Sequence, residues 1–246
     1  MSQALVLKET SDNVCYLTLN RPDKLNALNV ALFTELQTHI KSMKDDQSVK
    51  VVVLRGAGKC FSAGHDLGDI SEGEETSSLF WHSEILRSLE KLPVPVIAAV
   101  QGHCYTGALE VALAADFILA ADTARFADTH AKWALAPVWG MSQRLPRRVG
   151  IATAKRMMFS CATVNADEAF RIGLCEAVYP LSSFNEDIAE FAKQVTNNSS
   201  FSHAANKRLL EATDGKPMDA GLLWESMETE GVGPDMEERI AQFLNK

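Results

Sequence analysis

Two glycine-containing turns of this 246-residue chain have residue types suited to catalysis. The first, 59–67, reads Lys-Cys-Phe-Ser-Ala-Gly-His-Asp-Leu, and the second, 99–110, reads Ala-Val-Gln-Gly-His-Cys-Tyr-Thr-Gly-Ala-Leu-Glu. A single glycine-containing loop is usually an ordinary turn. Both loops, however, follow apolar strand-like runs, and loops at the carboxyl ends of parallel strands converge. We therefore predict that the main-chain N–H groups of Ala63 and Gly107 stabilise a developing oxyanion.

Glu110 lies three residues after Gly107, in the first turn of a predicted helix. One interpretation is that this carboxylate only complements the helix dipole. The residues that follow, Val111 to Ala114, are all apolar, which favours a buried carboxylate with a raised pKa. A carboxylate of that kind can act as a general base.

The elements that must position these residues alternate between strands and helices. Strands are predicted near 14–19, 50–54, 96–100 and 117–120, and helices near 29–40, 77–92 and 107–115. From residue 182 onward the pattern is helical only, and short amphipathic helices bury little surface alone. We predict an α/β protein with a core over residues 1–181 and a helical region over 182–246 that packs on the core or on another subunit.

Composition excludes several classes of protein. The chain has 24 Lys and Arg against 32 Asp and Glu, a net charge of −8, which argues against a nucleic-acid surface. No apolar run is long enough for a membrane span, and no export signal is visible. Five cysteines without a C-x-x-C pair favour reduced thiols over disulfides or structural zinc. We expect a cytoplasmic protein that binds neither metal, nucleic acid nor membrane.

Separated blocks of sequence make the chain resemble the crotonase superfamily, the enoyl-CoA hydratase/isomerase family. The blocks lie at 19–28, 61–67, 95–102, 115–120, 143–150 and 166–176. This resemblance implies a crotonase-like spiral of ββα units with a C-terminal helical region that packs in homotrimers, often paired into hexamers. It also implies acyl-CoA thioester ligands, with coenzyme A arriving as part of the substrate and no separate cofactor.

The resemblance also assigns roles to individual residues. The family's oxyanion donors fall on Ala63 and Gly107, and Glu110 matches one of the two catalytic glutamates of the hydratases. The coenzyme A cradle is expected at Arg21, Lys24, Asn26, Ala27, Ala63, Gly64, His65, Asp66 and Leu67, with Arg21 and Lys24 near the phosphates.

One departure from the family pattern concerns the second catalytic glutamate, whose position is occupied by His130. Histidine exchanges protons near neutral pH, so a direct catalytic role and a purely structural one both stay open. His65 additionally matches the methylmalonyl-CoA decarboxylase branch. We predict hydration of a 2-enoyl-CoA to a 3-hydroxyacyl-CoA. The alternatives are decarboxylation or other enolate chemistry on a malonyl-type CoA, and a non-catalytic acyl-CoA binder.

The acyl group itself is left open by the sequence. Trp81, Trp133 and Trp139 are candidates for the wall of an acyl pocket, although large aromatic side chains more often belong to the core.

Overall fold

The larger sheet of the protein carries most of its parallel strands. The computed structural model describes residues 3–66, 68 and 76–245, so the predicted site residue Leu67 lies outside the described residues. The spatial order of the strands is β1-β2-β3-β4-β6-β9, and all neighbours are parallel except the β1–β2 pair. Their bounds are Val6–Ser11 (β1), Val14–Leu19 (β2), Val51–Gly56 (β3), Val96–Val100 (β4), Phe117–Ala121 (β6) and Ala177–Tyr179 (β9).

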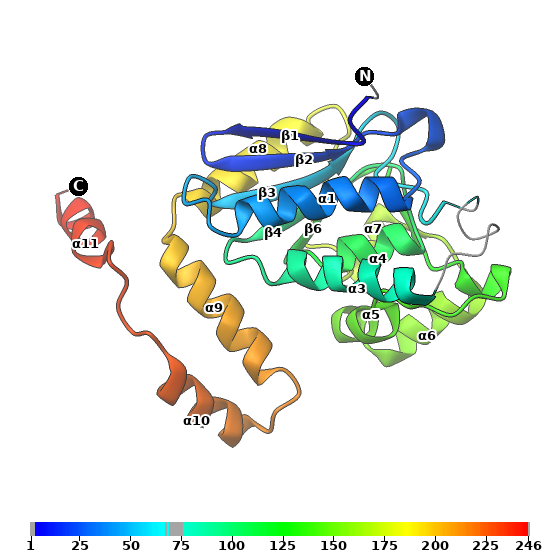
Figure 1. The fold of residues 1–246 in the computed structure, drawn as a ribbon. Helices are drawn as coiled ribbons and strands as arrows, with labels where there is room; N and C mark the ends of the chain where they lie inside the picture. The colour runs from blue at the N-terminus through cyan, green and yellow to red at the C-terminus, as the bar shows by residue number, and fades with distance from the viewer. Residues whose placement is uncertain (1–2, 67, 69–75, 246) are drawn as a thin grey trace.

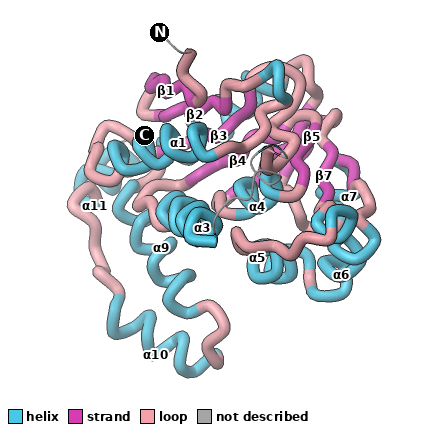
Figure 2. Tube along the Cα trace, turned by 45° about the vertical axis from the view of Figure 1, so that its right-hand side comes forward, coloured by secondary structure: helices cyan, strands magenta, loops and turns pink. Residues whose placement is uncertain are grey.

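A smaller sheet lies beside the first and contains β5 (His103–Tyr105), β7 (Arg125–Ala127) and β8 (Val164–Asn165). The chain passes repeatedly from one sheet to the other. It runs from β4 to β5, through α4 (Gly107–Leu113), and then from β6 to β7 (Figure 2). This alternation is a spiral of ββα units, and it confirms the predicted α/β class.

The remaining helices of the core lie on one side of the larger sheet (Figure 1). The Asn29 side chain caps α1 by accepting a hydrogen bond from the Leu32 N–H at 3.0 Å, and this places Leu32, Phe33 and Leu36 in the core, as the spacing predicts. The bounds are Val30–Met43 (α1), Thr76–Glu90 (α3), Met141–Val149 (α5), Ile151–Ser160 (α6) and Ala166–Arg171 (α7), with short 3-10 turns at Pro22–Lys24 (η1) and His130–Trp133 (η2).

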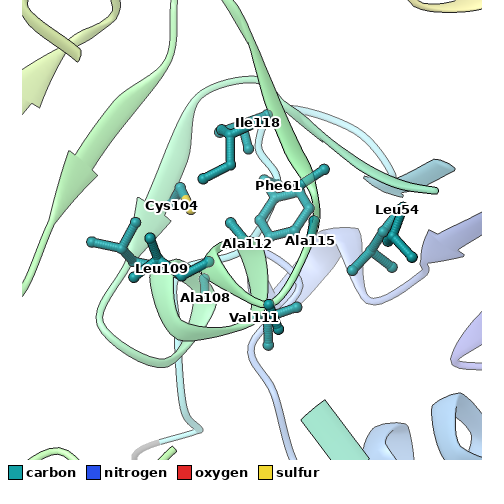
Figure 3. Close-up of a cluster of buried hydrophobic side chains, with 14 of the residues drawn as sticks. Leu54, Phe61, Cys104, Ala108, Leu109, Val111, Ala112, Ala115 and Ile118 are labelled. Atoms are coloured by element: carbon teal, nitrogen blue, oxygen red, sulfur yellow. The ribbon is translucent and has the colours of Figure 1, made fainter. Parts of the chain in front are cut away.

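Helix α4 is buried at every one of its seven positions. Its apolar side chains pack with Leu54, Phe61, Cys104 and Ile118 (Figure 3). A helix that is apolar all round belongs in a core, and Glu110 is therefore carried into an apolar environment by its neighbours.

The C-terminal helices fall into two groups. Alternate residues of β3 face opposite sides of the sheet, and Val51 and Val53 pack with Phe184 and Ile188 of α8 (Phe184–Thr196). The helices α9 (Ser200–Thr213), α10 (Met218–Glu228) and α11 (Met236–Leu244) have no buried residue and extend away from the sheets (Figure 1). Within the helical region predicted over 182–246, α8 therefore packs on the core, whereas α9, α10 and α11 leave every described residue at least partly exposed. Within the described part of the chain, no helix is long and apolar enough to cross a membrane.

Candidate active site

Glu110 is held in place by main-chain groups. Its side chain is 1 % exposed, and Oε1 accepts hydrogen bonds from the N–H groups of Trp139 at 3.0 Å and Met141 at 2.9 Å. Burial raises the pKa of Glu110 to about 7, against the lowering effect of those amides and of His130. The predicted burial and raised pKa of this carboxylate are therefore confirmed.

His130 faces the second oxygen of that carboxylate. Its Nε2 lies 3.9 Å from Glu110 Oε2, and its Nδ1 lies 2.6 Å from Asp128 Oδ1. Because a carboxylate only accepts, Nδ1 carries the proton toward Asp128 and Nε2 is directed at Glu110. Burial of the ring opposes its charging, but the hydrogen bond and charge of Asp128, with Glu110, raise the pKa of His130 overall.

Asp128 is a member of this cluster that the sequence reasoning missed. It is 1 % exposed, directly follows β7, and also accepts a hydrogen bond from the His130 N–H at 3.1 Å. The signal that would have found it is the Asp-x-His spacing, because a carboxylate two residues before a histidine can orient the ring.

Gly107 is the first residue of α4, and its surroundings leave no room for a side chain. A Cβ at this position would lie 2.4 Å from Cζ3 of Trp139 and 3.3 Å from the main-chain N of His65. The preceding Thr106 has a φ of 52°, a strained value for a β-branched residue. Its N–H donates to Ala127 O at 2.8 Å, and this strand–helix turn fixes where the Gly107 amide points.

The structure corrects the other half of the predicted oxyanion pair. The Ala63 N–H donates to Leu25 O at 2.9 Å, so this amide is already hydrogen-bonded within the chain. Two residues later, His65 bridges Leu28 in parallel register, with Leu28 N–H bonded to Gly64 O and Asp66 N–H bonded to Leu28 O. In that pattern the His65 N–H points away from Leu28. The amide beside Gly107 is therefore that of His65.

The residues predicted to bind coenzyme A fall into two groups, one buried within the fold and one on its surface. Asn26 is fully buried, and its amide donates to the carbonyls of Ala57 and Cys60 at 2.9 Å each. Its Oδ1 accepts from the Arg21 N–H at 2.9 Å, so this side chain holds the loop from inside, and its assignment to the coenzyme A site stays a prediction. Every polar atom of Asn26 is occupied within the chain.

The surface side of the same loop carries charge. Arg21 forms an ion pair with Asp66 at 2.9 Å and also donates to Ala27 O. Although partial burial opposes it, the Arg21 guanidinium holds the pKa of Asp66 below its usual value. Lys24 is exposed on η1, while Ala27 is partly exposed. The structure thus brings residues 21–27 and 63–66 together, as the resemblance implies.

An aromatic cluster lies against Gly107. The Trp139 ring has its centroid 4.8 Å from that of His65, 5.0 Å from His82 and 5.1 Å from Phe33. Trp81 packs on His82 at 4.9 Å, whereas Trp133 is 56 % exposed. No group of three or more metal-ligating side chains occurs within residues 3–66, 68 and 76–245.

Comparisons with known proteins agree with this architecture. Residues 9–239 match the family model described as enoyl-CoA hydratase/isomerase. The chain is 34 % identical to a short-chain-enoyl-CoA hydratase of Clostridium acetobutylicum, over 98 % of this chain and 95 % of that one. It is 30 % identical to a crotonyl-CoA hydratase of Syntrophomonas wolfei over the full length of both.

A solved structure is similar at the same level. The crystal structure of an enoyl-CoA hydratase from Bacillus anthracis superposes with a TM-score of 0.91 at 31 % identity, covering 98 % of this chain and 96 % of that one. The family model spans almost the whole chain, and the spiral of ββα units is shared with the solved structure. The chain belongs to the enoyl-CoA hydratase/isomerase family.

Proposed function

We propose that this enzyme adds water to the double bond of a 2-enoyl-CoA and forms a 3-hydroxyacyl-CoA. The observation that carries the proposal is the buried Glu110–His130 pair, whose facing atoms lie 3.9 Å apart. Such a pair holds one group able to accept a proton and one able to donate it. The full-length relatives named as hydratases support the same reaction.

The chemistry divides between main-chain and side-chain groups. The N–H groups of Gly107 and His65 bind the thioester oxygen and stabilise the enolate that forms when water attacks C3. Glu110 takes a proton from the attacking water, and His130 gives its Nε2 proton to C2. The proton on Glu110 then returns to His130, which restores both groups. The water oxygen bonds to C3 as the double bond opens, C2 takes the proton, and nothing is oxidised or reduced, so the reaction requires no cofactor beyond the coenzyme A of the substrate.

Asp128 acts in this scheme as a positioning residue. Its 2.6 Å hydrogen bond to Nδ1 keeps the other ring nitrogen directed at Glu110 and stabilises the charged imidazolium. The catalytic histidine therefore combines with two carboxylates, one that orients it and one that exchanges protons with it.

Coenzyme A is proposed to bind across the loop pair 21–27 and 63–66. Arg21 and the exposed Lys24 supply positive charge for its phosphates, and the backbone of the partly exposed Ala27 lies beside them. Asn26 supports this surface from inside the fold.

Assembly into homotrimers or pairs of trimers is proposed to involve the C-terminal helices. Leu210 of α9, Met227 of α10 and Phe243 of α11 are 73 %, 72 % and 78 % exposed, which is unusual for large apolar side chains. A second copy of the chain would cover these side chains, because short helices bury little surface alone. All five cysteines are free and buried, which supports a reducing compartment such as the cytoplasm.

A substrate panel tests the reaction. Hydration of crotonyl-CoA and longer 2-enoyl-CoAs is followed by loss of the conjugated absorbance, and carbon dioxide release is followed from methylmalonyl-CoA. We expect turnover on the enoyl substrates alone. Carbon dioxide release without hydration would instead establish the decarboxylase alternative, and tight acyl-CoA binding in calorimetry without any turnover would establish a binding protein.

A further inference from the structure

A buried hydrogen-bond donor beside the proposed oxyanion site takes no part in the proton transfers above. The Trp139 side chain is 1 % exposed, and its indole Nε1–H has no acceptor among the residues that the structure describes. Most buried N–H groups in proteins are paired, because leaving one unpaired is destabilising. The described part of the chain therefore retains a donor that it does not itself use.

The ring that carries this donor lies beside the proposed reaction site. Cζ3, on the edge of the indole opposite Nε1, lies 2.4 Å from where a Cβ of Gly107 would stand, and the main-chain N–H of Trp139 binds Glu110 at 3.0 Å. In the proposed reaction the thioester oxygen lies at Gly107, and C2 and C3 lie next to Glu110. The remainder of the acyl group, beyond C3, then extends along the indole.

The surroundings of the indole limit what that remainder can be. The rings of Phe33, His65 and His82 all have centroids about 5 Å from the Trp139 centroid. Rings at this spacing are in direct contact, so a long alkyl chain has to displace several of them. A short acyl group that accepts a hydrogen bond from the indole N–H gives this donor a partner and displaces few of the rings.

We propose that Trp139 selects acyl-CoA substrates whose acyl group carries an oxygen acceptor, such as a hydroxyl, one or two carbons beyond C3. The indole Nε1–H donates a hydrogen bond to this oxygen. The proposal rests on the proposed function, because the hydration site fixes where the acyl group lies. A site with a buried donor discriminates against an analogue that lacks the acceptor, since the donor then stays unpaired.

Isosteric substrate pairs test this selection. The first pair is 4-hydroxycrotonyl-CoA and 2-pentenoyl-CoA, and the second is 5-hydroxy-2-pentenoyl-CoA and 2-hexenoyl-CoA. We expect kcat/KM to favour the hydroxylated member of at least one pair by about tenfold, the size of one good hydrogen bond. Trp139→Phe, which keeps a ring and removes the N–H, is expected to bring that ratio to about one.

Trp133→Phe is the matched control, because it removes an indole N–H from the neighbouring turn η2 at a side chain that is 56 % exposed. It is expected to keep the wild-type ratio. Comparing ratios within each pair cancels any general loss of activity that Trp139→Phe causes through packing. Equal kcat/KM within both pairs for the wild type, or a ratio unchanged by Trp139→Phe, overturns the proposal.

A binding measurement separates this proposal from the reaction. Calorimetry compares the saturated isosteres 4-hydroxybutanoyl-CoA and pentanoyl-CoA, neither of which is hydrated. A lower Kd for the hydroxylated ligand that is lost in Trp139→Phe supports the selection even if no enoyl-CoA turns over. Normal hydration with no discrimination in either assay refutes the selection and leaves the hydratase assignment intact.

Discussion

Helices α4 and α10 show opposite relations to the rest of the molecule. All seven residues of α4 are buried, including a carboxylate, whereas α10 buries none of its residues and leaves Leu222 and Met227 more than half exposed. The first helix exists because the core encloses it. The second has its apolar surface turned outward, where the proposed assembly would cover it. The proposed chemistry and the proposed assembly thus lie in separate parts of one chain.

The largest expected effect comes from Glu110→Gln in α4. The amide still accepts the two main-chain hydrogen bonds but cannot take a proton from water, so we expect kcat for enoyl-CoA hydration to fall about 10²- to 10⁴-fold. The oligomeric mass, measured by light scattering, is expected to stay at the wild-type value. Full activity in this variant would remove Glu110 from the mechanism.

Asp128→Asn tests the positioning role next to the carboxylate. Loss of the charge that supports the imidazolium is expected to reduce kcat by roughly 10- to 10³-fold with a smaller effect on KM. Because Asp128 raises the pKa of His130, the alkaline limit of the rate–pH profile should move to lower pH. A variant with reduced kcat but an unshifted profile would indicate that Asp128 is only structural.

The free energy of unfolding is expected to depend on pH through the buried Glu110 of the core. The pKa of Glu110 rises from 4.5 to about 7 on folding, so its contribution to stability is present below pH 4.5 and is lost as pH rises through 7. His130, whose pKa is also raised, contributes in the same direction. Urea unfolding should show that stability relative to Glu110→Gln falls by roughly 1–3 kcal/mol across this range. An unchanged difference between pH 4 and 8 contradicts this linkage.

The smallest effect on kcat is expected from substitutions in helix α10. Leu222→Glu combined with Met227→Glu places charges on exposed apolar positions of α10, which should dissociate the assembly into single chains. Each chain still carries all the proposed catalytic groups, so kcat is expected to change less than about fivefold, while exposed substitutions alter stability by about 0.5 kcal/mol or less. Asp219→Asn on the same helix serves as the control. A double variant with the wild-type mass would show that α10 is not the interface.

The sequence predicted the neighbours of the site better than its hydrogen bonds. The resemblance assigned Glu110 and His130 to the two catalytic positions of the family. The structure brings their facing side-chain atoms to 3.9 Å. Ala63 was assigned wrongly because strand register decides which amide points outward, and register depends on the partner strand at Leu28. Asp128 escaped notice because its role depends on the ring orientation of a residue two positions away.

The extent of the helical region shows a similar limit. The pattern beyond residue 182 is helical throughout, and periodicity alone does not tell a helix that packs on the sheet from one that packs on another chain. The contact of Phe184 and Ile188 with β3 separates α8 from the helices that follow.

The two amides that hold Glu110 Oε1 belong to the main chain of positions 139 and 141, where the side chains are Trp and Met. Replacing either side chain leaves the amide in place. One residue can therefore serve two purposes: its main-chain N–H holds the catalytic carboxylate, and its side chain is free to differ with the substrate. Under the proposed selection, the main-chain N–H of position 139 holds the base while the side chain of the same residue meets the acyl group.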